Sequence, residues 1–235
     1  MESNCSCDDG RPVITESGES FRILIEEFLN GNDVSADGTN LDISNVPINC
    51  WNTGSVTDMS FAFERKQTFN EPIECWNTSQ VTSMEFMFNA ASIFEQSIGE
   101  WNTSSVKNME GMFQNTTVFN EPIGEWNTSS VKNMNSMFRF NEVFNQPIGE
   151  WNTSSVKTMF IMFESAVSFN QPIGDWDTSA VTFNPPPNFY GAMVNMFKDA
   201  SSFNQSIDAW DISNVTFMLG MFDGASSFNQ CLSTW

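Results

Sequence analysis

Apolar and polar positions repeat along this chain with a fixed period. Between one tryptophan and the next the same order of residues returns, as in "WNTSSVKNMEGMFQNTTVFNEPIGEW" from Trp101 to Trp126. The spacing is 25 residues five times, then 34, then 25 again, with tryptophans at positions 51, 76, 101, 126, 151, 176, 210 and 235. A fixed period of roughly 20–50 residues is typical of solenoids, propellers and other repeat arrays.

The pattern inside one repeat predicts two short elements. Val, Met, Met and Phe recur at i, i+3, i+6 and i+7 from Val106 to Phe113, which is the spacing of one helical face. We expect a short helix or 3₁₀ turn there, from about residue 105 to 113, and a short extended segment at Ile-x-x-Trp. A unit this small cannot bury its own apolar face and must stack on its neighbours. The predicted fold is a repeat solenoid of the α/β class, with one short parallel strand and one short helix or 3₁₀ turn per 25-residue rung.

The two ends of the chain differ from the middle. Residues 1–47 form an N-terminal segment in which "SGESFRILIEEFLNG" predicts an amphipathic helix over about residues 18–30, followed by a degraded half-repeat. This helix is suited to cover the first rung as a cap. Residues 48–235 hold seven units, and a loop is inserted in the sixth at 183–191, "FNPPPNFYG".

The stretch "FNQPIGEWNTSSVKTMFIMF" resembles the repeat of the BspA-like leucine-rich-repeat surface proteins, F-N-Q-x-I-x-x-W-x-T-S-x-V-x-x-M-x-x-M-F. The resemblance extends from about residue 48 to residue 235, with departures at Phe61 and Ala62 and at the inserted loop. It implies a right-handed solenoid with a parallel sheet. It also implies a surface or secreted protein that adheres or builds structure, and it implies no catalytic residue.

The charge balance narrows the classes of partner. Lys and Arg number 9 and Asp and Glu 29, a net charge of −20, so nucleic acid is an improbable partner. No apolar run reaches the length of a membrane span, and we expect no such span. The chain has no His, the commonest general base. A hydrolase using two carboxylates ranks last, because 29 acids supply a suitably spaced pair by chance. We therefore expect no enzyme.

Asn-x-Ser/Thr sequons are unusually frequent. Four recur one period apart at Asn77, Asn102, Asn127 and Asn152, and the others are at Asn4, Asn115, Asn204 and Asn214. In a secretory compartment we expect several of them to carry N-linked glycans. The alternative is that Asn, Thr and Ser serve as turn and cap residues, which a repeat copies without any glycan.

The position before each tryptophan holds a column of equivalent residues. Cys50 and Cys75 occupy it in consecutive units, and the spacing of adjacent parallel strands, ~4.8 Å, predicts a disulfide between them. The next four units carry Glu100, Glu125, Glu150 and Asp175. Like charges in a column either face solvent or hold a cation such as calcium. We favour solvation, because calcium needs six or more oxygen ligands.

These features predict an extracellular, glycosylated repeat protein that serves as an adhesive or structural building block. The alternative is an ice-binding solenoid that uses the threonine column Thr53, Thr78, Thr103, Thr128, Thr153 and Thr178.

Cys5, Cys7 and Cys231 remain after a Cys50–Cys75 bond, and an odd number of thiols suggests pairing between chains. We expect the C-terminal unit of one copy to dock head-to-tail on the N-terminal segment of the next, with Cys231 bonded to Cys5 or Cys7. The alternative is a C-terminal cap outside this sequence, with Cys5 paired to Cys7 or Cys231 paired elsewhere.

Overall fold

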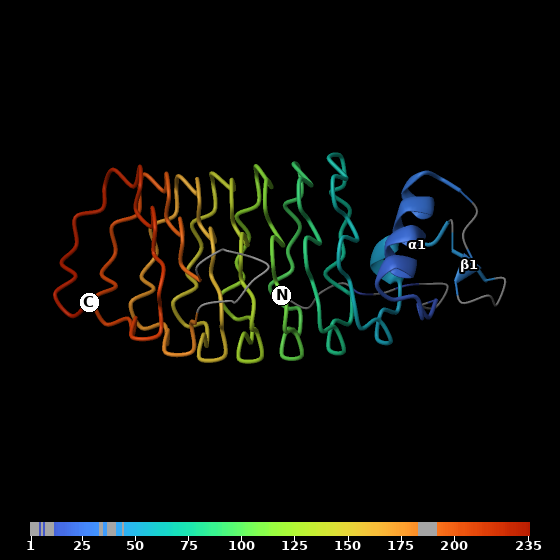
Figure 1. Cartoon of the computed structure of the whole chain (residues 1–235). Coiled ribbons are helices and arrows are strands. Elements are labelled where there is room, and N and C mark those ends of the chain that lie inside the picture. Colours follow the sequence, from blue (N-terminus) through green and yellow to red (C-terminus); the bar gives the residue numbers. More distant parts are fainter. Residues whose placement is uncertain are drawn as a thin grey trace.

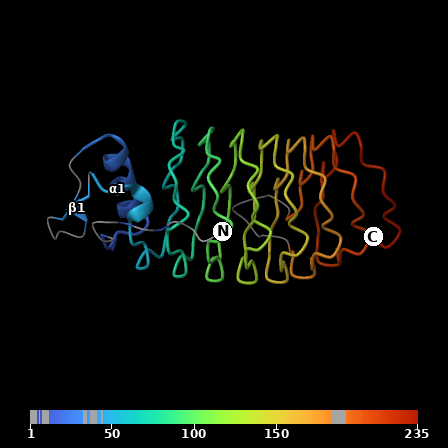
Figure 2. The same cartoon turned by 180° about the vertical axis from the view of Figure 1, so that it is seen from behind.

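The computed structural model describes residues 5, 7, 12–32, 35–36, 41–43, 45–182 and 192–235. The sequon at Asn4 and the inserted loop at 183–191 lie outside these ranges. We name each coil of the chain by the tryptophan that begins it, so that the Trp101 coil covers residues 101–125. Figures 1 and 2 show the coils standing side by side in one row, from the end that carries the helix α1 to the C-terminus.

Backbone hydrogen bonds join each coil to the next. The amide of Met59 donates to the carbonyl of Ser83 (3.0 Å), and that of Phe61 donates to Glu85 (2.8 Å). Equivalent bonds recur one coil further on, as from Met84 to Asn108 (2.9 Å). Among the described residues, parallel pairing within the coils is limited to isolated bridges: Asp58–Ser83, Ser83–Asn108, Asn108–Asn133 and Asn133–Thr158.

The local elements inside each repeat differ from the helix and the strand that the pattern favoured. Residues 105–113 contain turns and a single bridge instead of a helix. The Ile-x-x-Trp segment is also a turn rather than a strand, because the amide of Trp126 bonds back to the carbonyl of Ile123 (3.3 Å). Parallel pairing lies instead in the Val-x-x-Met segment, where the helix was expected.

A chain of four-residue turns explains this difference. The amide of Ala62 donates to Met59 (3.3 Å), and the third residue of that turn, Phe61, has a φ of 61°. Positive φ at the third residue is a feature of type II turns. It recurs in the later coils at Phe86, Ala90, Gly111, Asn115, Ser136, Phe140, Ile161, Ser165, Asn195, Asp199, Gly220 and Gly224. Turns of this kind place apolar residues three apart, as a helix also does.

The core consists of aromatic columns that run along the stack. Trp76 and Trp101 stack with ring centroids 6.4 Å apart, and Phe63 and Phe88 stack at 5.4 Å. The tryptophans from Trp51 to Trp210 are at most 4% exposed. The repeated apolar positions therefore form one continuous core.

The N-terminal end of the stack is covered by the helix α1, Glu19–Leu29, inside the range expected from the sequence. Its Phe21 packs edge-on against Trp76 (5.7 Å between centroids), and Phe28 packs against Trp51 (4.9 Å). Val13 forms a parallel bridge with Asn52, so the segment before α1 covers the edge of the Trp51 coil.

The remaining elements are short and lie between α1 and the Trp51 coil in sequence. Strands β1, Ser35–Ala36, and β2, Leu41–Asp42, pair antiparallel, and the 3₁₀ helix η1 spans Ile48–Cys50. A search of the described residues finds no helix that is both long enough and apolar enough to cross a membrane.

Candidate functional site

The four sequon asparagines that recur with the period form an exposed column. In the Trp101 coil the Oδ1 atom of Asn102 accepts hydrogen bonds from the amide (3.1 Å) and the hydroxyl (2.6 Å) of Ser104. The same pair of bonds joins Ser129 to Asn127 and Ser154 to Asn152. In the described part of the chain, no hydrogen bond uses the Nδ2 atoms of this column, the atoms to which a glycan would be attached. The column consists of Asn77, Asn102, Asn127 and Asn152.

At each of the other described sequons, the asparagine is half-buried or uses its Nδ2 atom in a hydrogen bond. The Nδ2 atom of Asn214 donates to the carbonyl of Ser179 (3.1 Å). Asn204 is half-buried, and its Oδ1 atom accepts from the amide of Asn229 (2.9 Å). Asn115 has a positive φ of 58° and is also half-buried.

In the Trp176 coil an aspartate replaces the sequon asparagine. Two hydrogen bonds from Ser179, one from its hydroxyl and one from its amide, lower the pKa of Asp177 below the ordinary value. The asparagine column therefore ends in an ionised carboxylate that keeps the same turn.

The threonine column does not form a surface. Thr103 is 1% exposed, and its hydroxyl donates to the carbonyl of Asn127 in the next coil (3.0 Å). The same bond recurs at every coil from Thr53 to Thr178. These hydroxyls satisfy carbonyl groups between coils, so the exposed threonine array that ice binding would need is not there.

The acidic column is exposed, and three of its four residues lie along a groove. Glu125, Glu150 and Asp175 line this groove of about 320 Å³ together with glycines and prolines of the same coils. Among the described residues, no group of three or more His, Cys, Asp or Glu is arranged to hold a metal ion. The idea of a calcium site at Glu100, Glu125, Glu150 and Asp175 gains no support from this arrangement.

The disulfides correct two expectations. Cys5 bonds to Cys75 (5.7 Å between Cα atoms), and Cys7 bonds to Cys50 (5.8 Å). The Cys50–Cys75 bond is therefore wrong, because the N-terminal segment supplies each column cysteine with its own partner. A bond from Cys231 to Cys5 or Cys7 is wrong for the same reason, and Cys231 is exposed and free.

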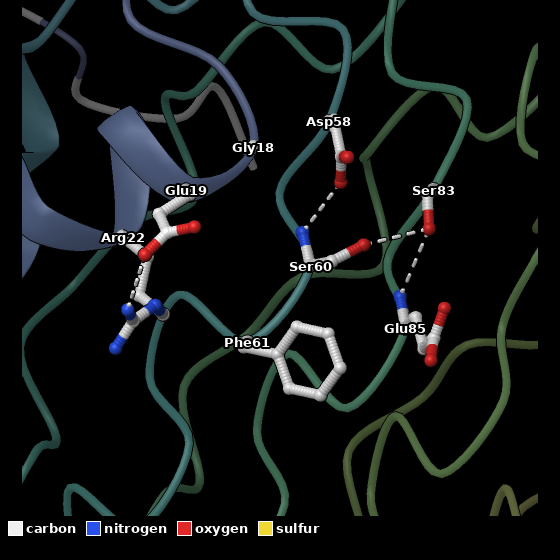
Figure 3. A pocket seen from close by; sticks show the side chains of 8 residues that line it. All are labelled: Gly18, Glu19, Arg22, Asp58, Ser60, Phe61, Ser83 and Glu85. Atoms are coloured by element: carbon white, nitrogen blue, oxygen red, sulfur yellow. Dashed lines mark hydrogen bonds and ion pairs between the residues drawn. The ribbon is translucent and has the colours of Figure 1, made fainter.

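A pocket of about 340 Å³ lies where the start of α1 meets the first coils (Figure 3). The hydroxyls of Ser60 and Ser83 bond to each other (2.7 Å), and Asp58 accepts from the amide of Ser60 (2.9 Å). Burial, then the charges of Glu110 and Asp58, raise the pKa of Glu85 above its ordinary value, against a lowering hydrogen bond from Asn108. These polar groups mainly satisfy one another, which is typical of a structural network.

Sequence reasoning missed this pocket because one of its walls lies outside the repeat. Gly18, Glu19 and Arg22 come from α1 and the residue before it, whereas the remaining lining residues come from the Trp51 and Trp76 coils. Only the tertiary contact between helix and coil brings them together.

One family model matches most of the chain. The family is described as "Mycoplasma protein of unknown function, DUF285", and its matches cover residues 34–138, 97–192 and 188–235. Neither a comparison with curated proteins nor one with solved structures finds a match. The overlapping matches follow the repeated coils and are consistent with the resemblance seen in the sequence. The chain belongs to the DUF285 repeat family.

Proposed function

We propose that this chain is an extracellular repeat protein that serves as an adhesive or structural building block. In this proposal the stack of coils is a solenoid of the leucine-rich-repeat kind, as in the BspA-like surface proteins that its repeat resembles. The observation that carries the proposal is the pair of disulfides, Cys5–Cys75 and Cys7–Cys50. Structural disulfides persist in oxidising compartments and are rare in the cytosol.

The asparagine column supports the presence of glycans in the same proposal. Asn102 and its equivalents are exposed, and their sequon serines hold them in the same turn in successive coils. Adjacent coils are only ~4.8 Å apart if they follow the spacing of parallel strands. Glycans on neighbouring coils would therefore crowd one another, and we expect occupancy at two or more of the four sites rather than at all of them.

Head-to-tail assembly is part of the proposal in a changed form. The helix α1 covers the Trp51 coil, so a second copy would meet the outer side of α1, where Ile23 is 47% exposed. The Trp210 coil offers Leu219, 78% exposed, and Phe217, 54% exposed, as the opposing apolar contact. Replacing Leu219 by Glu should abolish this contact, which sedimentation of both proteins would measure. If the wild type assembles and the Leu219→Glu variant has the same sedimentation coefficient, the Trp210 coil is not the contact surface.

The mass of the native protein tests the proposal as a whole. We expect the intact mass to fall on enzymatic deglycosylation, and peptide mapping without reduction to recover Cys5–Cys75 and Cys7–Cys50. Four free thiols at these positions in native material would place the chain in a reducing compartment and overturn the proposal. Bare asparagines with both disulfides formed would remove the glycans and leave the extracellular assignment standing.

A further inference from the structure

A column of lysines runs along the stack beside the repeated valines. Lys107, Lys132 and Lys157 occupy the same position in three consecutive coils, and all three are exposed. In the portion of the chain that the structure describes, none of them forms an ion pair, whereas Lys66 pairs with Glu26 and Lys198 with Glu164. Three unpaired cations in one column repel one another, because neighbours on adjacent strands are close.

The same three coils carry the acidic groove. Glu125, Glu150 and Asp175 line it, with Gly124 and Gly149 between them and exposed prolines alongside. Each coil therefore contributes one cation to the lysine column and one anion to the groove: Lys107 with Glu125, Lys132 with Glu150, and Lys157 with Asp175. The signal was present in the sequence, since the lysines recur with the 25-residue period.

Spacing makes the two columns complementary. Both contain one charge per coil, and the coils are joined by regular backbone hydrogen bonds, so the two columns share one repeat distance. A second copy of this chain presents that distance automatically, whereas an unrelated partner would have to match it. We propose that the lysine column of one copy docks along the acidic groove of a second copy, so that the stacks associate side by side.

The charge of the whole chain favours this partner over a linear polyanion. A net charge of −20 repels a polyanion from the surface around the lysines. Two copies also repel each other, and each exposed ion pair contributes little, so the association is expected to be weak and to need high micromolar protein. The contact differs from head-to-tail docking, which uses Leu219 and α1 rather than these columns.

Charge reversal on each column tests the inference in unglycosylated full-length protein. One variant carries Lys107→Glu, Lys132→Glu and Lys157→Glu, and the other carries Glu125→Lys, Glu150→Lys and Asp175→Lys. Analytical ultracentrifugation should show that the wild type self-associates. Each variant alone should bind itself about tenfold more weakly. An equimolar mixture of the two variants should associate again, because reversed columns are complementary to each other.

A matched control separates the columns from net charge. The variant with Glu71→Lys, Glu95→Lys and Glu142→Lys changes the net charge as much as the acidic-column variant does, at exposed positions outside the groove. It should self-associate at least as well as the wild type. A monomeric wild type at high micromolar concentration, or a mixture that fails to associate, would overturn the inference. Binding of dextran sulfate through the lysine column by a monomeric wild type would assign the column to a polyanion instead.

Discussion

The indole Nε1 of Trp126 donates a hydrogen bond of 3.0 Å to the carbonyl oxygen of Ile98, at the end of the Trp76 coil, two coils before its own. The same bond joins each later tryptophan to the isoleucine 28 residues before it, except across the inserted loop, where Trp210 reaches Ile173. Trp51 opens the first coil, and its buried Nε1 has no hydrogen-bond partner within the described part of the chain. The tryptophans therefore act as cross-links between coils as well as core residues.

Replacing Trp126 by Phe should destabilise the protein more than replacing Trp51 by Phe. Both changes remove similar buried area, but only the first breaks a hydrogen bond, that from the indole to the carbonyl of Ile98, which keeps the amide of Trp101 as its other donor. A typical intramolecular hydrogen bond contributes about 0.5–1.5 kcal/mol. Chemical denaturation should show a difference of about that size between the two variants. Equal losses of unfolding free energy would mean that the indole bond contributes nothing.

Replacing Thr103 by Val should also weaken the contact between coils. The side chain keeps its shape but loses the hydroxyl that satisfies the carbonyl of Asn127, and we expect a loss of about 1–3 kcal/mol. Thr117→Val is the matched control. The hydroxyl of Thr117 also bonds to the preceding coil, at Ser92, but the site is exposed and the change should stay within about 0.5 kcal/mol. Urea unfolding of both variants measures the contrast.

The sequence was sufficient to predict the periodic core, but it was insufficient to predict the local backbone conformation. The recurrence of Trp, Val, Met and Phe identified the buried columns, because burial depends only on which position repeats. It could not distinguish a helix from successive turns, since both place Met109 and Met112 three residues apart on one side. The decisive feature is positive φ at residues such as Phe86 and Ile161, which are types that rarely adopt it.

The candidate sites also differ in whether the repeat alone could predict them. The asparagine column is exposed, and the sequence located it through the 25-residue period of its sequons. Burial of the threonine column required knowledge of the hydrogen bond to the next coil. The disulfides depended on where Cys5 and Cys7 reach across the first two coils, and no periodic argument applies to residues outside the repeat.

Replacing Ala90 by Gly should stabilise the protein slightly. Ala90 has a φ of 57°, and the left-handed region costs an L-residue roughly 1–2 kcal/mol. Glycine removes that cost but loses more conformational entropy on folding, about 0.5–1 kcal/mol, so we expect a net gain of roughly 0.5 kcal/mol. The neighbouring Ala91→Gly should do the opposite, because Ala91 is fully buried and lacks a positive φ. Thermal unfolding should give shifts of opposite sign, and a lower melting temperature for Ala90→Gly would contradict the argument.

The raised pKa of Glu85 predicts how stability depends on pH at the junction with α1. Burial, Glu110 and Asp58 all disfavour the ionised carboxylate, so the folded state holds the proton at a higher pH than the unfolded state does. As the pH falls through the folded-state pKa toward the ordinary value of a glutamate, the folded state binds more protons and becomes more stable from this group. At a pH above the folded-state pKa, the ionised carboxylate lowers the free energy of unfolding by its full amount. Glu85→Gln should therefore stabilise the protein at neutral pH, with a benefit that vanishes once Glu85 is protonated in both states.

Two features of the site make this test specific to Glu85. The glutamine can still accept the hydrogen bond that Asn108 donates to the Glu85 carboxylate (2.8 Å), so the change removes charge without breaking the contact. Glu95→Gln is the control, because Glu95 is exposed and lies outside this pocket. The unfolding free energies of the three proteins should be measured between acid and neutral pH. The Glu85 variant should be more stable than the wild type at neutral pH and equal to it at low pH, and the Glu95 variant should show no such change. A benefit that stays constant across the range would show that the gain comes from packing, and the carboxylate would then have no part in the pH dependence of this junction.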